Sequence, residues 1–205
     1  MSHVFADISM SLDGYITGPN PGVGNGLGDH GERLHQWLFG LASWRRMHGL
    51  QGGTGGRDSE LLDEAFERAG SFVMGRRMFD IAEEPWGDEP PFHGPVFVVT
   101  HRPHPPLVKQ GGTTFHFITE GPEDAVRRAT EAAAGKDVSV AGGADVIRQL
   151  LTADLLDELQ IHLVPVLLGG GLRLFDSLPP GLRELDTTRV VASPGVTHVR
   201  LRPAK

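Results

Sequence analysis

Two stretches of this sequence follow the same pattern, in which a short apolar run stops at glycine and an amphipathic segment begins. In SFVMGRRMFD (71–80) the run stops at Gly75, and in VSVAGGADVI (138–147) it stops at Gly142 and Gly143. A buried strand, a glycine turn and a helix form the repeating unit of a parallel α/β sheet. This pattern constrains the fold more strongly than any other feature of the chain.

The rest of the chain supplies further strands and helices for such a sheet. Apolar or alternating runs predict strands over 4–12, 95–101, 115–119, 158–171 and 196–202. Helical spacing predicts helices over 31–47, 59–70 (capped by Ser59) and 122–135. Strands separated by helices indicate a mainly parallel sheet, and final strands joined only by a loop indicate an antiparallel addition. Because no stretch reads as a linker, residues 1–205 are expected to form a single domain.

Composition and charge exclude several classes of function. The formal net charge is −7, from 19 basic and 26 acidic residues, so no general affinity for nucleic acid or anionic membranes is expected. The absence of cysteine excludes disulfides and thiolate chemistry and fits a reducing cytoplasm. No apolar run approaches the ~18 residues of a membrane span, and the N-terminus lacks the pattern of a signal peptide. Ten histidines occur without metal-ligand spacing, so no metal site is expected.

The turn at Gly75 carries two arginines where a buried strand is predicted to end. In a parallel sheet, ligands bind beyond the carboxyl ends of the strands, where helix N-termini offer unpaired N–H groups and a partial positive charge. Gly75 permits a close approach to the backbone, and Arg76 and Arg77 add permanently charged groups suited to phosphate oxygens. The alternative is a surface turn whose arginines are only solvated.

Two further strand ends favour the phosphate-binding interpretation. Residues 141–145 form a second junction of strand, glycines and helix, and Thr100-His101-Arg102 places a hydroxyl, an imidazole and a guanidinium at a third. Three such ends in one sheet indicate a dinucleotide site, and their clustered cations favour NADP over NAD. The GxGxxG match at 26–31 is excluded as the nucleotide fingerprint, because a loop precedes it where that fingerprint needs a strand.

Five motifs occur in the order found in the dihydrofolate reductase fold family: SLDGYITG, VMGRRMF, VFVVTHR, VAGGADVI and LDELQIHLVPVLLGGGLRLF. Over nearly its whole length, the chain resembles the stand-alone relatives of the reductase domain of the riboflavin-biosynthesis enzyme. The resemblance implies an α/β fold with a mixed, mostly parallel sheet of about eight strands flanked by helices. It also implies NADPH as hydride donor and a homodimer.

The same resemblance assigns the cofactor to the three strand ends. Arg76 would hold the adenosine 2′-phosphate, and the backbone at Arg77 and Met78 would meet the diphosphate. The glycine pair at 142–143 and the N–H groups that follow it would cradle the diphosphate from the other side. The implied cofactor-binding residues are Gly75, Arg76, Arg77, Met78, Thr100, His101, Arg102, Ala141, Gly142, Gly143, Ala144, Asp145 and Val146.

On the substrate side, the sequence departs from the family's two best-known patterns. Asp7 stands where the riboflavin-pathway reductases carry a lysine, and neither acid of DHGERLHQW aligns securely with the pterin-facing acid of dihydrofolate reductases. The sequence therefore matches the substrate-side pattern of neither enzyme. The turn at Asp13 and Gly14 would cover the nicotinamide.

Asp7, Asp13 and His162 are the candidate catalytic residues, and Ser9 and Trp37 are the candidate substrate-binding residues. A carboxylate at position 7 would bind a substrate amide edge or assist protonation beside the hydride acceptor. His162, which faces inward by the same analogy, is its candidate polar partner. The alternatives are a solvated Asp7, an ordinary core or surface histidine, and a tryptophan that only packs in the core.

Together these expectations describe hydride transfer from NADPH to a C=N or C=O carbon of a small heterocyclic or sugar-linked substrate, pterin- or aminopyrimidine-like in shape. The glycine-rich loop at 17–31 is expected to be mobile and to act as a lid. The alternative is an NADP(H)-binding sensor, or a relative that has lost its reaction. A nucleic-acid-binding module is disfavoured by the net charge of −7 and by the lack of a basic stripe.

Overall fold

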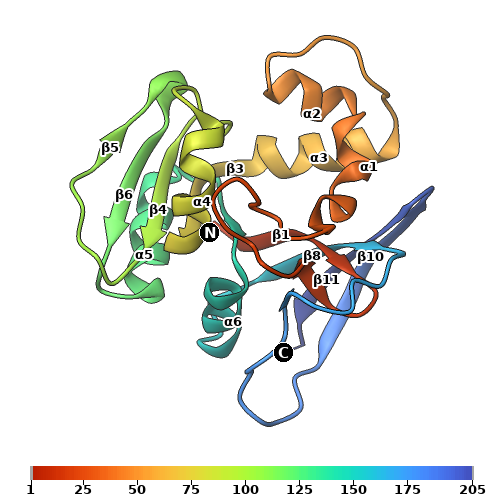
Figure 1. The fold of residues 1–205 in the computed structure, drawn as a ribbon. Helices are drawn as coiled ribbons and strands as arrows, with labels where there is room; N and C mark the ends of the chain where they lie inside the picture. Colours follow the sequence, from red (N-terminus) through yellow and green to blue (C-terminus); the bar gives the residue numbers. More distant parts are fainter. Residues whose placement is uncertain (1, 205) are drawn as a thin grey trace.

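The computed structural model describes residues 2–204, whose main feature is a nine-stranded sheet in the order β10-β11-β8-β1-β7-β3-β4-β6-β5 (Figure 1). The strands are β1 (Val4–Ser11), β2 (Tyr15–Thr17), β3 (Ala69–Gly75), β4 (Pro95–Val99), β5 (Leu107–Val108), β6 (Thr114–Ile118), β7 (Asp137–Gly142), β8 (Glu158–Val164), β9 (Leu172–Arg173), β10 (Leu185–Ser193) and β11 (Val196–Pro203). The helices are η1 (Gly31–Leu34), α1 (Gln36–Phe39), α2 (Ala42–Met47), α3 (Arg57–Arg68), α4 (Arg76–Trp86), η2 (Gln110–Gly112), α5 (Pro122–Ala132) and α6 (Ala144–Thr152). Strands β2 and β9 form a separate pair.

The central strands β8, β1, β7, β3, β4 and β6 pair in parallel, and the two sheet edges are antiparallel. At one edge the C-terminal hairpin β10–β11 adds to β8, and at the other the two-residue β5 adds to β6. This confirms the predicted mixed, mostly parallel α/β sheet, with the antiparallel addition at the end of the chain. The sheet draws its strands from residues 4 to 203.

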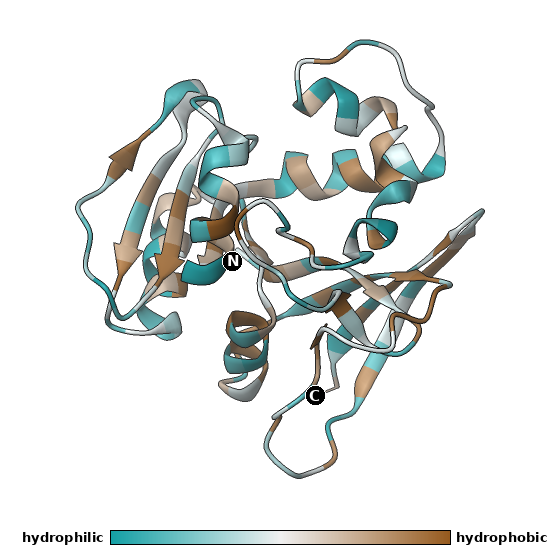
Figure 2. Cartoon of the chain, in the orientation of Figure 1, coloured by the Kyte–Doolittle hydropathy of each residue, from teal (hydrophilic) through white to brown (hydrophobic). Residues whose placement is uncertain are grey.

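Helices cover both faces of the sheet (Figure 1). One core lies on the side of α5 and α6 and contains even-numbered β1 residues such as Val4 and Ala6. A second core on the opposite side joins α4 to β3, β4 and β6 through Phe79, Phe72 and Phe115. Figure 2 shows apolar segments along the strands and polar segments on exposed helix turns and loops. Each fully buried apolar side chain contributes about 1.5–3 kcal/mol, so both cores hold the strand ends in place.

The predicted helix over 31–47 is wrong in its continuity, because it breaks into η1, α1 and α2. At the second break, Thr54 donates to the Gly40 carbonyl and accepts from the Ala42 N–H, and these bonds replace helical ones. Ser59 is not a cap, since α3 begins two residues earlier and the Ser59 hydroxyl is buried against Ser43. None of the helices within residues 2–204 is long and apolar enough to cross a membrane.

The loop expected to be mobile, 17–31, is closed by hydrogen bonds within itself. Gly18 donates to the Leu27 carbonyl at 2.8 Å, and Asp29 donates to the Pro19 carbonyl at 2.7 Å. Gly28 has a φ of +73°, and a Cβ there would lie 2.3 Å from the Gly18 oxygen. The glycines of the GxGxxG match therefore allow the loop to pack on itself, in agreement with their exclusion as a nucleotide fingerprint.

Candidate functional site

Three predicted junctions lie at the carboxyl ends of adjacent strands, β7, β3 and β4. Met74 pairs with Gly142 and Gly75 pairs with Val99, so the three ends are level with one another. A Cβ on Gly75 would lie 3.3 Å from Val146 Cγ2 and 3.9 Å from the Gly143 nitrogen. Positions far apart in the sequence are thus brought to one edge of the sheet.

Two helix N-termini point into this edge without side-chain caps. Helix α4 begins after Gly75 and α6 begins after Gly143, and neither cap residue makes a side-chain hydrogen bond to its helix. The first N–H groups of a helix have no partner within the helix, and they attract anions. A Cβ on Gly143 would meet nothing within 4 Å, so there is open space beside this backbone. Gly142 has a φ of +141°, and the peptide bond that follows it is cis.

Arg76 and Arg102 come from two of the strand ends and meet at Asp80. Arg76 Nε and Arg102 Nη2 each lie 2.6 Å from an Asp80 carboxylate oxygen. Partial burial acts to raise the pKa of Asp80, but hydrogen bonds and charge from the two arginines outweigh it and lower that pKa. The result is a pair of cations held at one place, with Arg102 largely exposed.

The other residues of these ends have distinct roles in the local structure. Thr100 is buried, and its hydroxyl accepts from the Arg102 N–H at 3.0 Å, while His101 is exposed. The Met78 side chain packs against Gly142, since a Cβ added to Gly142 would lie 2.9 Å from the Met78 sulfur. The Asp145 side chain is exposed and pairs with Arg148 along α6, so this residue offers only its backbone to the edge.

Arg77 points to the loop and not to the other arginines. Its Nη2 donates to the Pro21 carbonyl at 3.1 Å. A cavity of about 260 Å³ lies here, lined by Pro19, Asn20, Pro21, Arg77, Gly171 and Leu172. The loop at 17–31 thus contacts the first turn of α4, which is the contact expected of a loop that covers this helix end.

Asp7 lies where β1 and β7 stop pairing. The two strands pair from Val4 with Val138 to Ala6 with Val140, after which β1 continues beside β8 alone. Asp7 Oδ1 lies 2.5 Å from His162 Nε2, and the Asp7 side chain remains 23% exposed while His162 is buried. The predicted partnership of Asp7 and His162 is therefore present in the structure.

A third strand extends this contact. His198 of β11 is paired in register with His162 of β8, and the two Nδ1 atoms lie 2.6 Å apart. On its other side, His198 Nε2 lies 3.2 Å from Asp58 Oδ1, at the start of α3. Four side chains from β1, β8, β11 and α3 thus form one line, which we call the acid–imidazole chain: Asp7, His162, His198 and Asp58.

Ser9 and Trp37 lie against this chain. The Trp37 Nε1–H donates to Ser9 Oγ at 3.1 Å, and its ring centroid lies 4.6 Å from that of His162 and 5.1 Å from that of His198. Ser9 is buried and Trp37 is half-buried. The indole ring therefore covers both imidazoles and still reaches the surface.

The Asp13 carboxylate is occupied in holding a turn. It accepts from Ser11 Oγ at 2.6 Å, from the Leu168 N–H at 3.1 Å and from the Gly169 N–H at 2.8 Å. Partial desolvation acts to raise the pKa of Asp13, but these hydrogen bonds dominate and lower it to about 2. A carboxylate with so low a pKa is a poor proton donor, so Asp13 fits a positioning role better than proton transfer.

Sequence reasoning missed Asp58, Asp80 and His198. Asp80 stands four residues after Arg76, a spacing that pairs charges on one helix face and could have revealed it. His198 lies two residues after the buried Val196 in the last strand, so the two side chains share one face of that strand. No local signal places His198 beside His162, which is 36 positions away. Among residues 2–204, no group of three or more histidine or acidic side chains is placed to hold a metal ion.

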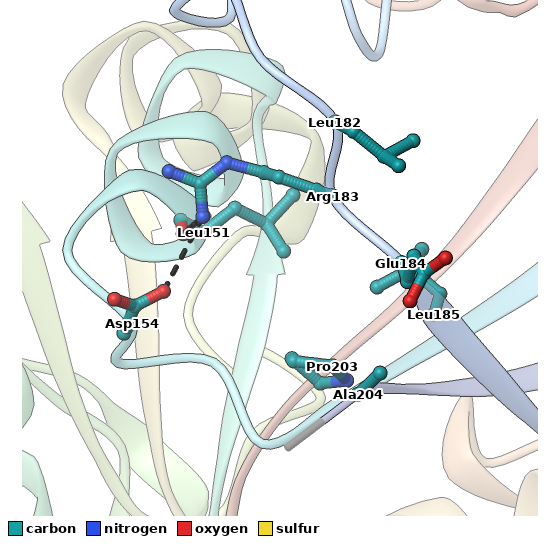
Figure 3. A pocket seen from close by; sticks show the side chains of 8 residues that line it. All are labelled: Leu151, Asp154, Leu182, Arg183, Glu184, Leu185, Pro203 and Ala204. Atoms are coloured by element: carbon teal, nitrogen blue, oxygen red, sulfur yellow. Dashed lines mark hydrogen bonds and ion pairs between the residues drawn. The ribbon is translucent and has the colours of Figure 1, made fainter.

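A larger cavity, of about 430 Å³, lies between the C-terminal end of α6 and the outer ends of β10 and β11 (Figure 3). Its lining includes Leu151, Asp154, Arg183 and Pro203, and none of the predicted site residues. Arg183 crosses it to contact Asp154. The predicted chemistry therefore lies away from this cavity.

Solved structures of similar fold include several reductases. A putative riboflavin biosynthesis protein from Shewanella sp. PV-4 has a TM-score of 0.67 at 23% identity, with both chains covered in full. A diaminohydroxyphosphoribosylaminopyrimidine deaminase/5-amino-6-(5-phosphoribosylamino)uracil reductase from Thermotoga maritima has a TM-score of 0.59 at 13% identity, over 99% of this chain and 57% of that one. Dihydrofolate reductase from Enterococcus faecalis, solved with NADP(H), has a TM-score of 0.52 at 12% identity, over 99% and 97%. Identities this low show a shared fold.

Sequence comparison adds the family. The uncharacterized protein YwjB of Bacillus subtilis (strain 168) is 36% identical over 62 residues, which are 30% of this chain and only 35% of YwjB. The model of the RibD C-terminal domain matches residues 2–198. Since the match spans nearly the whole chain, the protein belongs to the RibD C-terminal domain family.

Proposed function

We propose that this protein is an NADPH-dependent reductase, which transfers hydride to a C=N or C=O carbon of a small pterin- or aminopyrimidine-like substrate, heterocyclic or sugar-linked. The observation that carries the proposal is the sheet edge where two uncapped helix N-termini meet the Arg76–Arg102 pair. Family membership supports it, as does the fold shared with a dihydrofolate reductase solved with NADP(H).

The residues at the sheet edge fit a dinucleotide. The first N–H groups of α4 and α6 suit a diphosphate, and the open space at Gly143 lets it approach the backbone. Arg76 and Arg102, pre-oriented by Asp80, suit a further phosphate, which would compete with that carboxylate for their N–H groups. An anionic ligand gains from two cations that are already held in place, because little side-chain entropy remains to be lost.

The chain's own residues then provide position and a proton. The nicotinamide carrier, when bound, supplies the hydride. Asp7, partly exposed beside the point where β1 and β7 separate, would deliver the proton to the nitrogen or oxygen of the reduced bond. His162 orients the Asp7 carboxylate, and Trp37 excludes water from the histidine side of the site. The hydrogen bond from Trp37 fixes Ser9 Oγ, whose hydroxyl then contributes to a polar wall beside Asp7.

Isothermal titration of the Arg76→Ala variant with NADPH and with NADH tests the cofactor assignment. Hydrogen bonds to charged groups contribute about 1.5–3 kcal/mol, so NADPH affinity should fall roughly 10- to 150-fold while NADH affinity changes little. Arg127→Ala removes an exposed arginine of α5 and serves as the matched control. Equal losses for both carriers would refute the phosphate contact. Binding of NADPH without its consumption across pteridines, pyrimidines and quinoid acceptors would favour a sensor.

A further inference from the structure

The acid–imidazole chain connects two solvent-facing carboxylates through two buried imidazoles. The contacts are Asp7 Oδ1 to His162 Nε2 at 2.5 Å, Nδ1 to Nδ1 between the imidazoles at 2.6 Å, and His198 Nε2 to Asp58 Oδ1 at 3.2 Å. His162 and His198 are 4% and 1% exposed, whereas the Asp7 and Asp58 side chains are 23% and 21% exposed. All four ring nitrogens have a polar partner within this line.

Counting protons shows that the chain is not neutral imidazoles between two ionised carboxylates. Each of its three contacts needs one hydrogen, but two neutral imidazoles carry only two N–H groups. If His162 donates to Asp7 and accepts from His198, then His198 Nε2 presents a lone pair to the Asp58 carboxylate. The arrangement is complete only when one additional proton is shared among the four groups. A metal cannot replace this proton between the rings, because 2.6 Å separates their nitrogens.

We propose that the acid–imidazole chain stores one proton that moves between Asp58 and Asp7, and that Asp7 gives it to the reduced substrate. With the proton on Asp58, Asp58 donates to His198 Nε2, His198 donates through Nδ1 to His162, and His162 donates through Nε2 to the ionised Asp7. Three short transfers, one in each contact, place the proton on Asp7 and leave Asp58 ionised, and both imidazoles are neutral before and after. Once Asp7 has given its proton to the substrate, the partly exposed Asp7 carboxylate takes another from solvent, which restores the same arrangement.

The surroundings of the chain favour transfer along it. Trp37 covers both imidazoles, and His198 is also packed beneath α3, so their nitrogens reach solvent only through the two carboxylates. Ser193 Oγ donates to the Asp58 carboxylate and holds its position. Burial and the neighbouring His162 lower the pKa of His198, while the hydrogen bond and charge of Asp58 and the charge of Asp7 act in the opposite direction. Because the net effect is a lowered pKa, His198 does not hold an additional proton itself and passes it on.

Other charged groups near the chain do not take its proton. His35 is the third imidazole close to His162, and burial lowers the pKa of His35 to about 4, so it stays neutral above that pH. The next ion pair along β11 and α3 is Arg200 with Glu64, whose nitrogen and oxygen lie 2.7 Å apart. That Asp7 gives the proton to a substrate rests on the proposed reductase function, whereas the sharing of a proton along the acid–imidazole chain does not.

Nuclear magnetic resonance of the whole protein, without cofactor, tests the chain directly. With ¹⁵N-histidine and ¹³C-aspartate labels, we expect a ¹⁵N–¹⁵N coupling across the hydrogen bond between the two Nδ1 atoms. In Asp58→Asn, the amide can donate to His198 Nε2, so the shared proton is lost, His162 is fixed as the Nε2–H tautomer and Asp7 is fixed as an ionised carboxylate.

Asp63→Asn is the matched control, because Asp63 lies on the same helix and pairs with Arg46 outside the chain. This variant should leave every signal of the chain unchanged. The inference is overturned if the coupling between the two Nδ1 atoms is absent. It is also overturned if the Asp7 and His162 signals in Asp58→Asn match those of the wild type, because an Asp58 that only supports the structure would not affect Asp7 at the other end of the chain. Failure of the wild type to bind NADPH would overturn the proposed function and leave these spectra standing.

Discussion

Lowering the pH from 7 to 4.5 should destabilise the fold through His35. This residue lies between η1 and α1, and its Nδ1 is buried without a hydrogen-bond partner. Burial is the main reason that the pKa of His35 falls from 6.5 to about 4; a hydrogen bond with the Gly31 backbone opposes this shift, and repulsion from His162 adds to it. The unfolded chain therefore takes up a proton at a pH where the folded chain does not.

The sign and the size of the effect follow from linkage. A depressed histidine pKa means that the unfolded state binds more protons between pH 6.5 and 4, so stability decreases as the pH falls through that window. One pH unit corresponds to about 1.4 kcal/mol, so His35 should account for about 2–3 kcal/mol between pH 7 and 4.5. Carboxylates with lowered pKa values lose their contributions mainly below this window, which separates the two effects.

Urea unfolding at both pH values, for the wild type and for His35→Gln, measures the difference. Since burial also lowers the pKa values of His116 and His198, the test is the change in pH dependence between the two proteins. Between pH 7 and 4.5, the free energy of unfolding should fall by about 2–3 kcal/mol less in His35→Gln than in the wild type. His101→Gln, which replaces an exposed imidazole, should show the same fall as the wild type. An identical pH dependence in His35→Gln and the wild type would show that His35 is solvated, and the reasoning would fail.

Three further predictions concern the site and its scaffold. Asp7→Asn should lower turnover with the true acceptor by at least about 10²-fold while leaving NADPH affinity nearly intact; unchanged turnover would remove Asp7 from the mechanism. Glu158→Gln should cost about 3 kcal/mol in urea unfolding, because Glu158 is buried and faces three arginines, whereas the exposed Glu131→Gln should change little. Gly28→Ala should lower the melting temperature by several degrees, because φ is positive at Gly28 and the new Cβ would overlap a backbone oxygen. The control is Gly22→Ala, whose Cβ would meet no neighbour. Equal melting temperatures for the two variants would contradict the close packing of the loop.

Short-range pattern was enough to predict the elements that place the sheet edge. Strands β3, β4, β6 and β7 and helices α5 and α6 follow the predicted ranges to within a few residues, because a buried parallel strand needs an uninterrupted apolar run and a helix needs apolar spacing near 3.6. The prediction failed over 31–47, where backbone bonds to Thr54 outweigh the helical spacing. A contact with a residue outside the segment cannot be read from the segment itself.

The sequence by itself determined the mixed α/β fold, the family, the position of the glycine junctions and the candidates Asp7 and His162. The tertiary structure alone decided that His198 and Asp58 continue the line from those two residues. His198 reaches His162 only through the register of β11 on β8, and Asp58 reaches His198 only through the packing of α3 on the sheet. Hydrogen bonds depend on tenths of an ångström between atoms that here lie 36 and 140 residues apart, and no local periodicity carries that information.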